Sequence, residues 1–421
     1  MAEFFNYLLD CGAYALSGGR WSVAPDNLFG VVVTALVQVI ILLHVIAVGA
    51  LIFIWLERKV AGRIQDRLGP TRVGGKFGWL QTLADGIKLI TKEDLMPAGA
   101  DGFLFKAAPY VSMAAALAAY FALPFAGSPL PFVAQQLNVA AFFIVAVLGL
   151  EVFGVILAGY SSASKWALFG SMREAAQVVS YEVPLGLCAV VPVMLAGSMD
   201  LVVVGDTQRG LFTNWYLFHD PFTFVVFWVY FTCGTASVNR APFDLAEAES
   251  ELVAGFHTEY SGLRWSFFFM AEYGSMFTVS MLAAILFLGG WHGPLPVTEW
   301  LGMQADGWLE YSTSPGIAAY LCNLIGMTNV VLKAGLLVTV MMWARWTLPR
   351  LRIDQVMTTC LKYCTPIAAV MFVGAAVWQA ALPRGLMLRT PLANIAASEP
   401  WQRGAEPVVQ TSGIAVDKEA R

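Results

Sequence analysis

Long runs without a charged residue limit what this chain can fold into more than any other feature. Such runs occupy residues 28–56, 107–150, 221–239 and 363–383. A helix that crosses a bilayer needs about 20 predominantly apolar residues. Each run is close to that length or longer, so the sequence predicts an all-α integral membrane protein.

The number of spans follows from breaks within the apolar sequence. Residues 107–150 are too many for one helix, and the Pro-rich segment 124–131 divides them. Three further apolar segments each carry a single ionisable residue. We expect eight transmembrane helices, near residues 28–56, 107–125, 134–160, 175–198, 221–239, 266–289, 316–344 and 363–383. Residues 1–27 form an N-terminal lead without a cleavable signal peptide, residues 28–383 the membrane domain, and residues 384–421 a mobile tail.

Composition excludes several other classes of protein. The chain is 58% hydrophobic and 13% charged, whereas a soluble domain carries about 25% charged residues. Its net charge of −4 offers no basic surface for nucleic acid. The six cysteines form no C-x-x-C motif, and only His44 lies in a predicted span. Iron–sulfur clusters, zinc and haem need clustered thiolates or paired imidazoles, so we expect no metal site.

Lysine and arginine orient the predicted spans. With eight spans, both termini lie on the same side of the membrane. Loops 57–106, 161–173, 240–265 and 345–362 hold 17 Lys and Arg residues, and the termini and other loops hold 7. Because basic loops stay on the cytoplasmic side, the first set is expected there and both termini in the periplasm.

The long loop 57–106 contains an amphipathic segment at residues 77–92. Its apolar residues share one helical face and its polar residues another: Leu80, Leu83, Ile87 and Ile90 against Gln81, Asp85, Lys88 and Lys92. We expect a cytoplasmic helix that lies along the membrane interface or docks on another subunit. The sequence leaves both alternatives open.

Four ionisable residues lie inside four different spans: Glu151, Glu182, Glu272 and Lys333. A charged side chain in the bilayer costs at least about 2.5–3.5 kcal/mol, so each is a functional candidate by default. Spaced by water, three acids and one amine could form a proton relay. Pairing with a neighbour or snorkelling is the structural alternative for each residue, and a metal site is the weaker functional one.

The predicted loop 240–265 is strongly acidic. Five carboxylates, Asp244, Glu247, Glu249, Glu251 and Glu259, lie within sixteen residues, and Arg240 is the only Lys or Arg between residues 239 and 260. On a helix, Asp244, Glu247 and Glu251 would share a face. The loop could therefore be an amphipathic helix with a solvated acidic side. Its single charge sign and its place between two spans favour an acidic cavity at the membrane surface.

Several motifs together resemble the H-subunit family of bacterial NADH:quinone oxidoreductase, which is respiratory complex I. The resemblance runs in order over residues 28–383. Its motifs are Leu56-Glu-Arg-Lys59, Gln65-Asp-Arg-Leu-Gly-Pro70, Ser180-Tyr-Glu182, Arg240-Ala-Pro-Phe-Asp244, Glu249-Ser-Glu-Leu252, Ala271-Glu-Tyr273 and Leu348-Pro-Arg-Leu-Arg-Ile-Asp-Gln355.

The resemblance implies a multi-pass subunit of the bacterial plasma membrane, in contact with lipid, that is not catalytic alone. Quinone would be the substrate, with no covalently bound cofactor on this chain, and flavin and iron–sulfur clusters would lie on partner subunits. Those partners would be the peripheral-arm subunits of the quinone site and small and antiporter-like membrane subunits. The chain would share the quinone chamber and begin the proton path.

The same resemblance assigns roles to individual residues. Those that match the quinone chamber are Glu57, Arg58, Arg63, Asp85, Arg240, Asp244, Glu247, Glu249 and Glu251. Those that match the proton path in the membrane are Glu182, Glu272 and Lys333.

One position departs from the family pattern. Many relatives have an acid where this chain has Ser237, two residues before Asn239. This chain has acids at Glu151 and Glu174, where many relatives are neutral. A relay constrains the spacing of its protonatable groups more than the helix that supplies them. We therefore hypothesise that Glu151 and Glu174 replace the missing acid in the proton path.

Three other functions compete with this interpretation. The homologous subunit of a membrane-bound hydrogenase shares the fold, but the long first loop and its Gln65-Asp-Arg-Leu-Gly-Pro70 motif favour the quinone-reducing branch. An independent transporter would predict repeats at half-length, and the two halves differ in loop lengths and charge positions. The cluster of like-charged acids argues against a purely structural anchor.

Overall fold

The computed structural model describes residues 28–127, 131–246, 249–295 and 317–381, which are helical and contain no strand. The predicted lead, the predicted tail and Glu247 lie outside these residues. The long helices are α2 (Leu28–Ile64), α4 (Gly102–Phe121), α5 (Ala140–Ser161), α6 (Lys165–Ala196), α8 (Pro221–Ser237), α10 (Gly262–Phe287), α13 (Ile317–Thr347) and α15 (Thr365–Ala381). The shorter ones are α3 (Gln81–Thr91), α7 (Leu201–Asp206), η1 (Phe212–Asn214), η2 (Tyr216–Phe218), α9 (Glu249–Leu252), η3 (Gly255–His257), α14 (Ile353–Met357) and the π-helical η4 (Thr358–Cys364).

Within the residues that the structure describes, seven helical segments are long and apolar enough to cross a bilayer, the last of them formed by α14, η4 and α15 together. The apolar runs of the sequence therefore predicted the main helices correctly. The expected count of eight is not confirmed, because α8, at the fifth predicted span, has only 17 residues. At 1.5 Å per residue it is about 26 Å long.

Helix ends follow local side-chain chemistry. The Asp101 carboxylate accepts hydrogen bonds from the backbone N–H of Phe103 and of Leu104, at 3.1 and 3.2 Å, and so caps the start of α4. Asp220 caps α8 in the same way, and Pro221 follows as its first residue. These caps satisfy backbone donors that a helix start leaves without partners.

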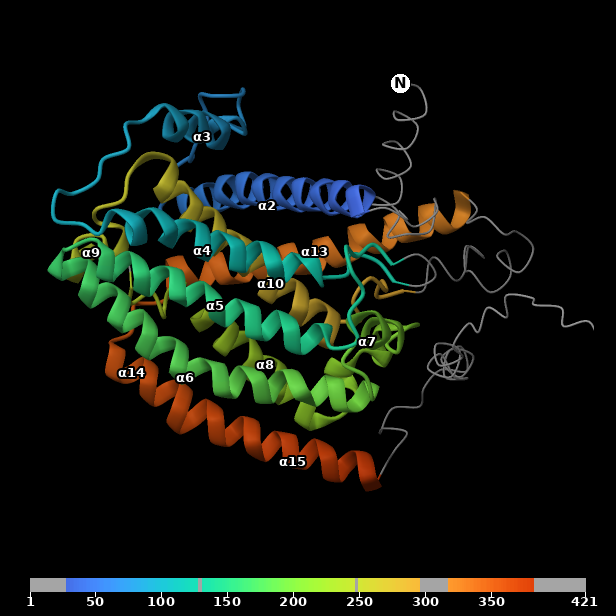
Figure 1. The fold of residues 1–421 in the computed structure, drawn as a ribbon. Coiled ribbons are helices and arrows are strands. Elements are labelled where there is room, and N and C mark those ends of the chain that lie inside the picture. Colours follow the sequence, from blue (N-terminus) through green and yellow to red (C-terminus); the bar gives the residue numbers. More distant parts are fainter. Residues whose placement is uncertain (1–27, 128–130, 247–248, 296–316, 382–421) are drawn as a thin grey trace, which may run out of the picture.

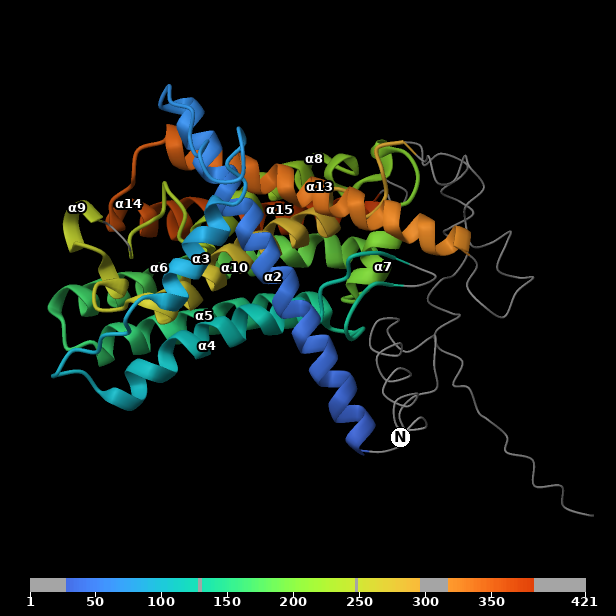
Figure 2. The same cartoon turned by 90° about the horizontal axis from the view of Figure 1, so that it is seen from above.

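Helix α10 is the centre of the bundle. In its most apolar stretch 83% of the residues are buried, against 22% in α2. It packs against α2, α4, α8 and α13, and Figure 1 shows the long helices running side by side around it. From above, α2 runs obliquely across them and its N-terminal end projects from the bundle (Figure 2). Contacts from these neighbours, and from α3 at the start of the helix, hold the residues of α10 in place.

The chain direction brings the ends of the described long helices together at one end of the bundle. Here α2, α5, α8 and α13 finish and α4, α6, α10 and the last helical segment, α14–η4–α15, begin; we call this the polar end. Helices α3, α9 and α14 lie there too, on the left of Figure 1. Helix α3 confirms the predicted amphipathic helix, and Leu83, Ile87 and Ile90 on its apolar face are exposed.

The tight contact between α4 and α5 depends on Gly154, and we expect Gly154→Ala to destabilise the protein. A Cβ atom there would lie 2.7 Å from the backbone nitrogen of Ser112 and 2.9 Å from the carbonyl oxygen of Ala108. Backbone cannot move aside as a flexible side chain can, and overpacking costs about 1–3 kcal/mol. Thermal unfolding of the purified complex in mild detergent should show a lower midpoint.

The matched control is Gly186→Ala in α6, where a Cβ atom meets nothing within 4 Å. This variant should unfold at the wild-type temperature or slightly above it, because alanine favours helix more than glycine does. Equal midpoints for the two variants would contradict the packing argument.

Candidate functional site

Arg240 is the central charge at the polar end. It follows α8, and its side chain is only 2% exposed. Its Nη1 atom donates to the Glu57 carboxylate at 3.0 Å, and its Nε atom lies 2.9 Å from a Glu272 oxygen. Burial alone lowers the pKa of Arg240, but the charges of Glu272 and Glu57 outweigh that effect and raise it well above its usual value. The guanidinium therefore stays charged.

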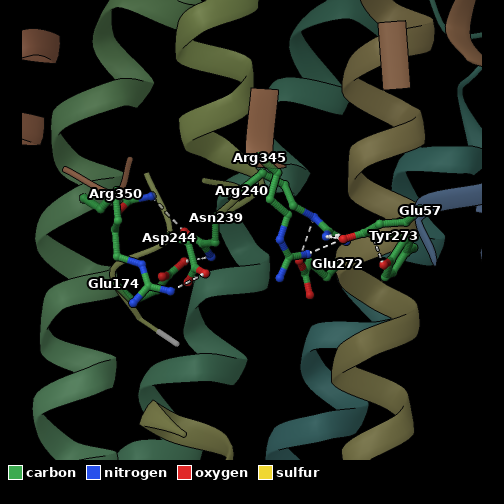
Figure 3. A network of polar contacts seen from close by, with 10 residues as sticks. Glu57, Glu174, Asn239, Arg240, Asp244, Glu272, Tyr273, Arg345 and Arg350 are labelled. Carbon is green, nitrogen blue, oxygen red and sulfur yellow. Dashed lines mark hydrogen bonds and ion pairs between the residues drawn. The ribbon is translucent and has the colours of Figure 1, made fainter. Parts of the chain in front are cut away.

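Glu57 joins three helices through its carboxylate. Besides Arg240, it accepts hydrogen bonds from Nη1 of Arg345 at 2.7 Å and from the Tyr273 hydroxyl. The Arg240 guanidinium also lies 4.3 Å from the centre of the Tyr273 ring. Figure 3 shows this group of side chains on one side of the view. Breaking one partner of such a buried ion pair typically costs about 3–5 kcal/mol.

A second polar group surrounds Glu174 in α6. Asn239 donates a hydrogen bond to Glu174, and Gln177 donates to the Asn239 side chain at 2.8 Å. Asp244 accepts from Nη2 of Arg350 at 3.2 Å. This group lies beside the first one in Figure 3. The segment from residue 239 to 244 therefore belongs to both groups and links them.

Beside these groups lies a partly enclosed cavity of about 30 Å³. Its polar lining includes Glu151, Glu174 and Glu272, together with Ser237 at the end of α8. Glu151 also accepts a hydrogen bond from the Ser275 hydroxyl. A buried water needs roughly 10–15 Å³ of such space, so the cavity has room for about two water molecules. Three carboxyl groups from three helices thus share one water-sized space.

Glu182 lies two helical turns beyond Glu174 and does not line this cavity. It is partly exposed, and its carboxylate packs over Gly149 of α5. A side chain at Gly149 would overlap that carboxylate. Because Gly149 has no Cβ atom, the Glu182 carboxylate has space at this position.

Lys333 does not join the acids, although the sequence suggested one relay. Its Nζ atom donates to the carbonyl oxygens of Leu288, Gly290 and His292, at 2.6, 2.9 and 2.5 Å, and lies 4.2 Å from the Trp215 ring centre. Sixteen residues of helix, about 24 Å, separate Leu288 from Glu272. Lys333 therefore caps the far end of α10, where the carbonyls carry partial negative charge.

His292 next to this cap is neutral. Burial and the positive charges of Lys333 and Arg209 lower the pKa of His292 to about 3. Its ring therefore adds no second positive charge beside Lys333 at neutral pH.

The remaining predicted residues are spread over the polar end. Arg58 pairs with Asp85 of α3 at a partly exposed position, and Arg63 is exposed. Glu251 in α9 is 53% exposed and accepts from Arg173 at 2.6 Å, whereas Glu249 is described only by its helical backbone.

The helical face expected for the acidic loop does not form around Asp244. Residues 240–246 are not helical, because Pro242 disfavours helical backbone at the residue before it and buried ion pairs hold Arg240 and Asp244.

Sequence reasoning missed Arg345, Arg350 and Tyr273. The two arginines follow a span, where cations are ordinary markers of topology, and the tyrosine is one of 13 in the chain. The sequence did offer a signal, because Tyr273 and Arg350 lie inside quoted motifs and Arg345 lies three residues before one.

Among the described residues, no group of three or more His, Cys, Asp or Glu is arranged to hold a metal ion.

Comparisons with known proteins agree with the resemblance. The chain matches the NADH dehydrogenase family over residues 37–376. It is 42% identical to the H subunit of NADH-quinone oxidoreductase from Chlorobium luteolum, over 90% of this chain and 100% of the relative. It is 44% identical to the H subunit from Anaeromyxobacter dehalogenans, over 79% and 78% of the two chains.

A third relative is the NADH-quinone oxidoreductase H subunit numbered 2 from Rhizobium etli, which is 40% identical over 84% of this chain and 96% of its own. The matched range, residues 37–376, contains both polar groups, the cavity and the Lys333 cap. The chain therefore belongs to the NADH dehydrogenase family, as a homologue of the H subunit of NADH-quinone oxidoreductase.

Proposed function

We propose that this chain forms part of the quinone-binding chamber of a respiratory complex I and begins its proton path. Quinone is the substrate, and flavin and iron–sulfur clusters belong to partner subunits. The observation that carries the proposal is the cavity shared by Glu151, Glu174 and Glu272. Through Glu272 and Arg240, these acids connect to Glu57 at the polar end.

The chamber side of the proposal rests on the polar end. Glu57 and Arg240 are buried at this end, and the Arg58–Asp85 pair and Arg63 are more exposed. In the proposal, the first two belong to the chamber wall and the other three to its rim. Peripheral-arm subunits would close the chamber over this rim. The exposed apolar face of α3 offers them, or lipid, a surface to cover.

The path side of the proposal is electrostatic. Two-electron reduction of a quinone to the quinol takes up two protons, and the groups that give up these protons change their charge near the Glu57 and Arg240 pair. Like charges a few ångströms apart in a poor dielectric interact by kcal/mol, so coupled carboxyl groups exchange protons when a neighbour's charge changes. Glu151 and Glu174 would supply the acid that the family pattern places at Ser237, and Glu182 would continue the path.

The topology of the proposal has eight crossings. Helix α8, about 26 Å long, nearly spans a hydrocarbon core of about 30 Å. The polar end, with its excess of Lys and Arg, would face the cytoplasm of a bacterial cell. Both termini would then lie in the periplasm. The proton path would continue from this chain into small and antiporter-like membrane subunits.

Purification in mild detergent tests the assignment to complex I. We expect the chain to be recovered with a complex that has flavin and iron–sulfur absorbance and oxidises NADH in a quinone-dependent, inhibitor-sensitive manner. Recovery with a nickel–iron hydrogenase, or as a chain without partners, would overturn the proposal.

Glu151→Gln and Glu174→Gln test the proton path in the assembled complex. Glutamine keeps the shape of glutamate and one acceptor oxygen but carries no titratable acid. For the double variant we expect coupled turnover to fall by on the order of a hundredfold, the low end of the contribution of a positioned acid or base. The measurements, both in proteoliposomes, are the rate of quinone-dependent NADH oxidation per complex and the number of protons pumped per electron.

The matched control restores the acid at its family position. Adding Ser237→Glu to the double variant should return pumping, because residue 237 lines the same cavity. If Glu151→Gln and Glu174→Gln both keep full pumping, these residues do not replace the missing acid.

Variants of Lys333 distinguish its role as a cap of α10 from a role as a proton carrier. Lys333→Arg should keep the ratio of protons to electrons, because arginine can also donate to the carbonyl cage while remaining charged. Lys333→Met should lower the thermal midpoint of the complex, because three buried carbonyls lose their donor. A Lys333→Arg complex that assembles normally and reduces quinone without pumping would place Lys333 in the path instead.

A further inference from the structure

The first polar group contains equal numbers of positive and negative charges. Arg240 and Arg345 are the cations, and Glu57 and Glu272 are the anions; we call these four residues the quartet. Arg345 binds Glu57, Glu57 binds Arg240, and Arg240 binds Glu272, at 2.7, 3.0 and 2.9 Å. The quartet is therefore a chain of three ion pairs with a formal net charge of zero.

The four members differ in their access to the surface. The side chains of Arg240, Glu57 and Glu272 are 2%, 8% and 14% exposed, and that of Arg345 is 28% exposed. Arg345 lies in the last turn of α13. It is therefore the member nearest to the protein surface, at one end of the chain of ion pairs.

The connector between α13 and α14 is bound to the loop that carries Arg240. The backbone N–H of Leu351 donates to the Pro242 carbonyl at 2.9 Å, and Arg350 pairs with Asp244. The side chains of Leu351 and Ile353 pack against buried residues that include Phe243 and Leu245. The end of α13 thus meets the quartet at a defined position.

We propose that Arg345 is a positioning residue of the quinone reaction, which balances the charge of the buried quartet and transmits charge changes at the polar end to it. The proposal rests on the proposed function, in which the quartet connects the quinone chamber to the membrane acids. When Arg345 is drawn toward an anion outside, the quartet is left with a net charge of −1. That charge acts on Glu272, and through the cavity on Glu151 and Glu174.

Charge balance makes a prediction that packing alone does not. Arg345→Gln leaves the quartet at −1, Glu57→Gln leaves it at +1, and the double variant returns it to zero. An uncompensated buried charge is strongly destabilising, whereas a pair removed together is often tolerated. The second substitution should therefore repair the first, whereas two independent packing defects would add.

The experiment compares the two single variants and the double variant in the whole complex. We expect each single variant to reduce the amount of intact complex by about tenfold or more, and the double variant to recover most of it. Quinone-dependent NADH oxidation per complex should be higher in the double variant than in Glu57→Gln. Assembly is measured independently of proton pumping, so this result stands even if the proton-path proposal fails.

Arg352→Gln is the matched control, since it removes the same charge from an exposed residue of the same connector. It should leave assembly unchanged and should not repair Glu57→Gln. Arg345→Lys, which keeps the charge and can reach one oxygen, should assemble better than Arg345→Gln. The proposal is overturned if the double variant assembles less well than both singles, or if all variants assemble equally.

Discussion

The buried guanidinium of Arg240 is the interaction on which the polar end depends. A charge that is 2% exposed is tolerable only if carboxylates reach it. Glu57 comes from α2 and Glu272 from α10, so these helices must meet where the loop after α8 passes. The same loop places Asn239 against Glu174. One buried cation thereby determines how three distant parts of the sequence are arranged.

The apolar runs predicted the helices well because a bilayer-length run has few alternatives to a helix. They placed Glu151 and Glu272 inside predicted spans, whereas Glu57 and Glu174 were singled out only through the family resemblance, and Asp244 also through its acidic loop. The runs could not say which acids meet, because helix rotation and neighbour choice depend on packing that no local pattern contains. Lys333 illustrates this: it was grouped with the acids as an intramembrane charge, yet it lies with carbonyls at the far end of α10.

Arg345 and Arg350 show a second limit of sequence reasoning. Cations after a span are expected on topological grounds alone, so their position in the sequence carried no further meaning. Only the folded chain shows that both reach buried carboxylates, Glu57 and Asp244. Ser237 shows the opposite case. A departure from a family pattern directed attention to Glu151 and Glu174, and the structure brings these acids and Ser237 to the same cavity.

Helix α10 is held by two cations, one in its first half and one at its far end. Arg240 binds Glu272 in its first half, and Lys333 from α13 holds the carbonyls that follow its last turn. Neighbours cover most of the surface between these points. Tilting or sliding of α10 would break one of these charged contacts, so both motions are opposed. We therefore expect the backbone of α10 to stay in place when the side chains around Glu272 change their contacts.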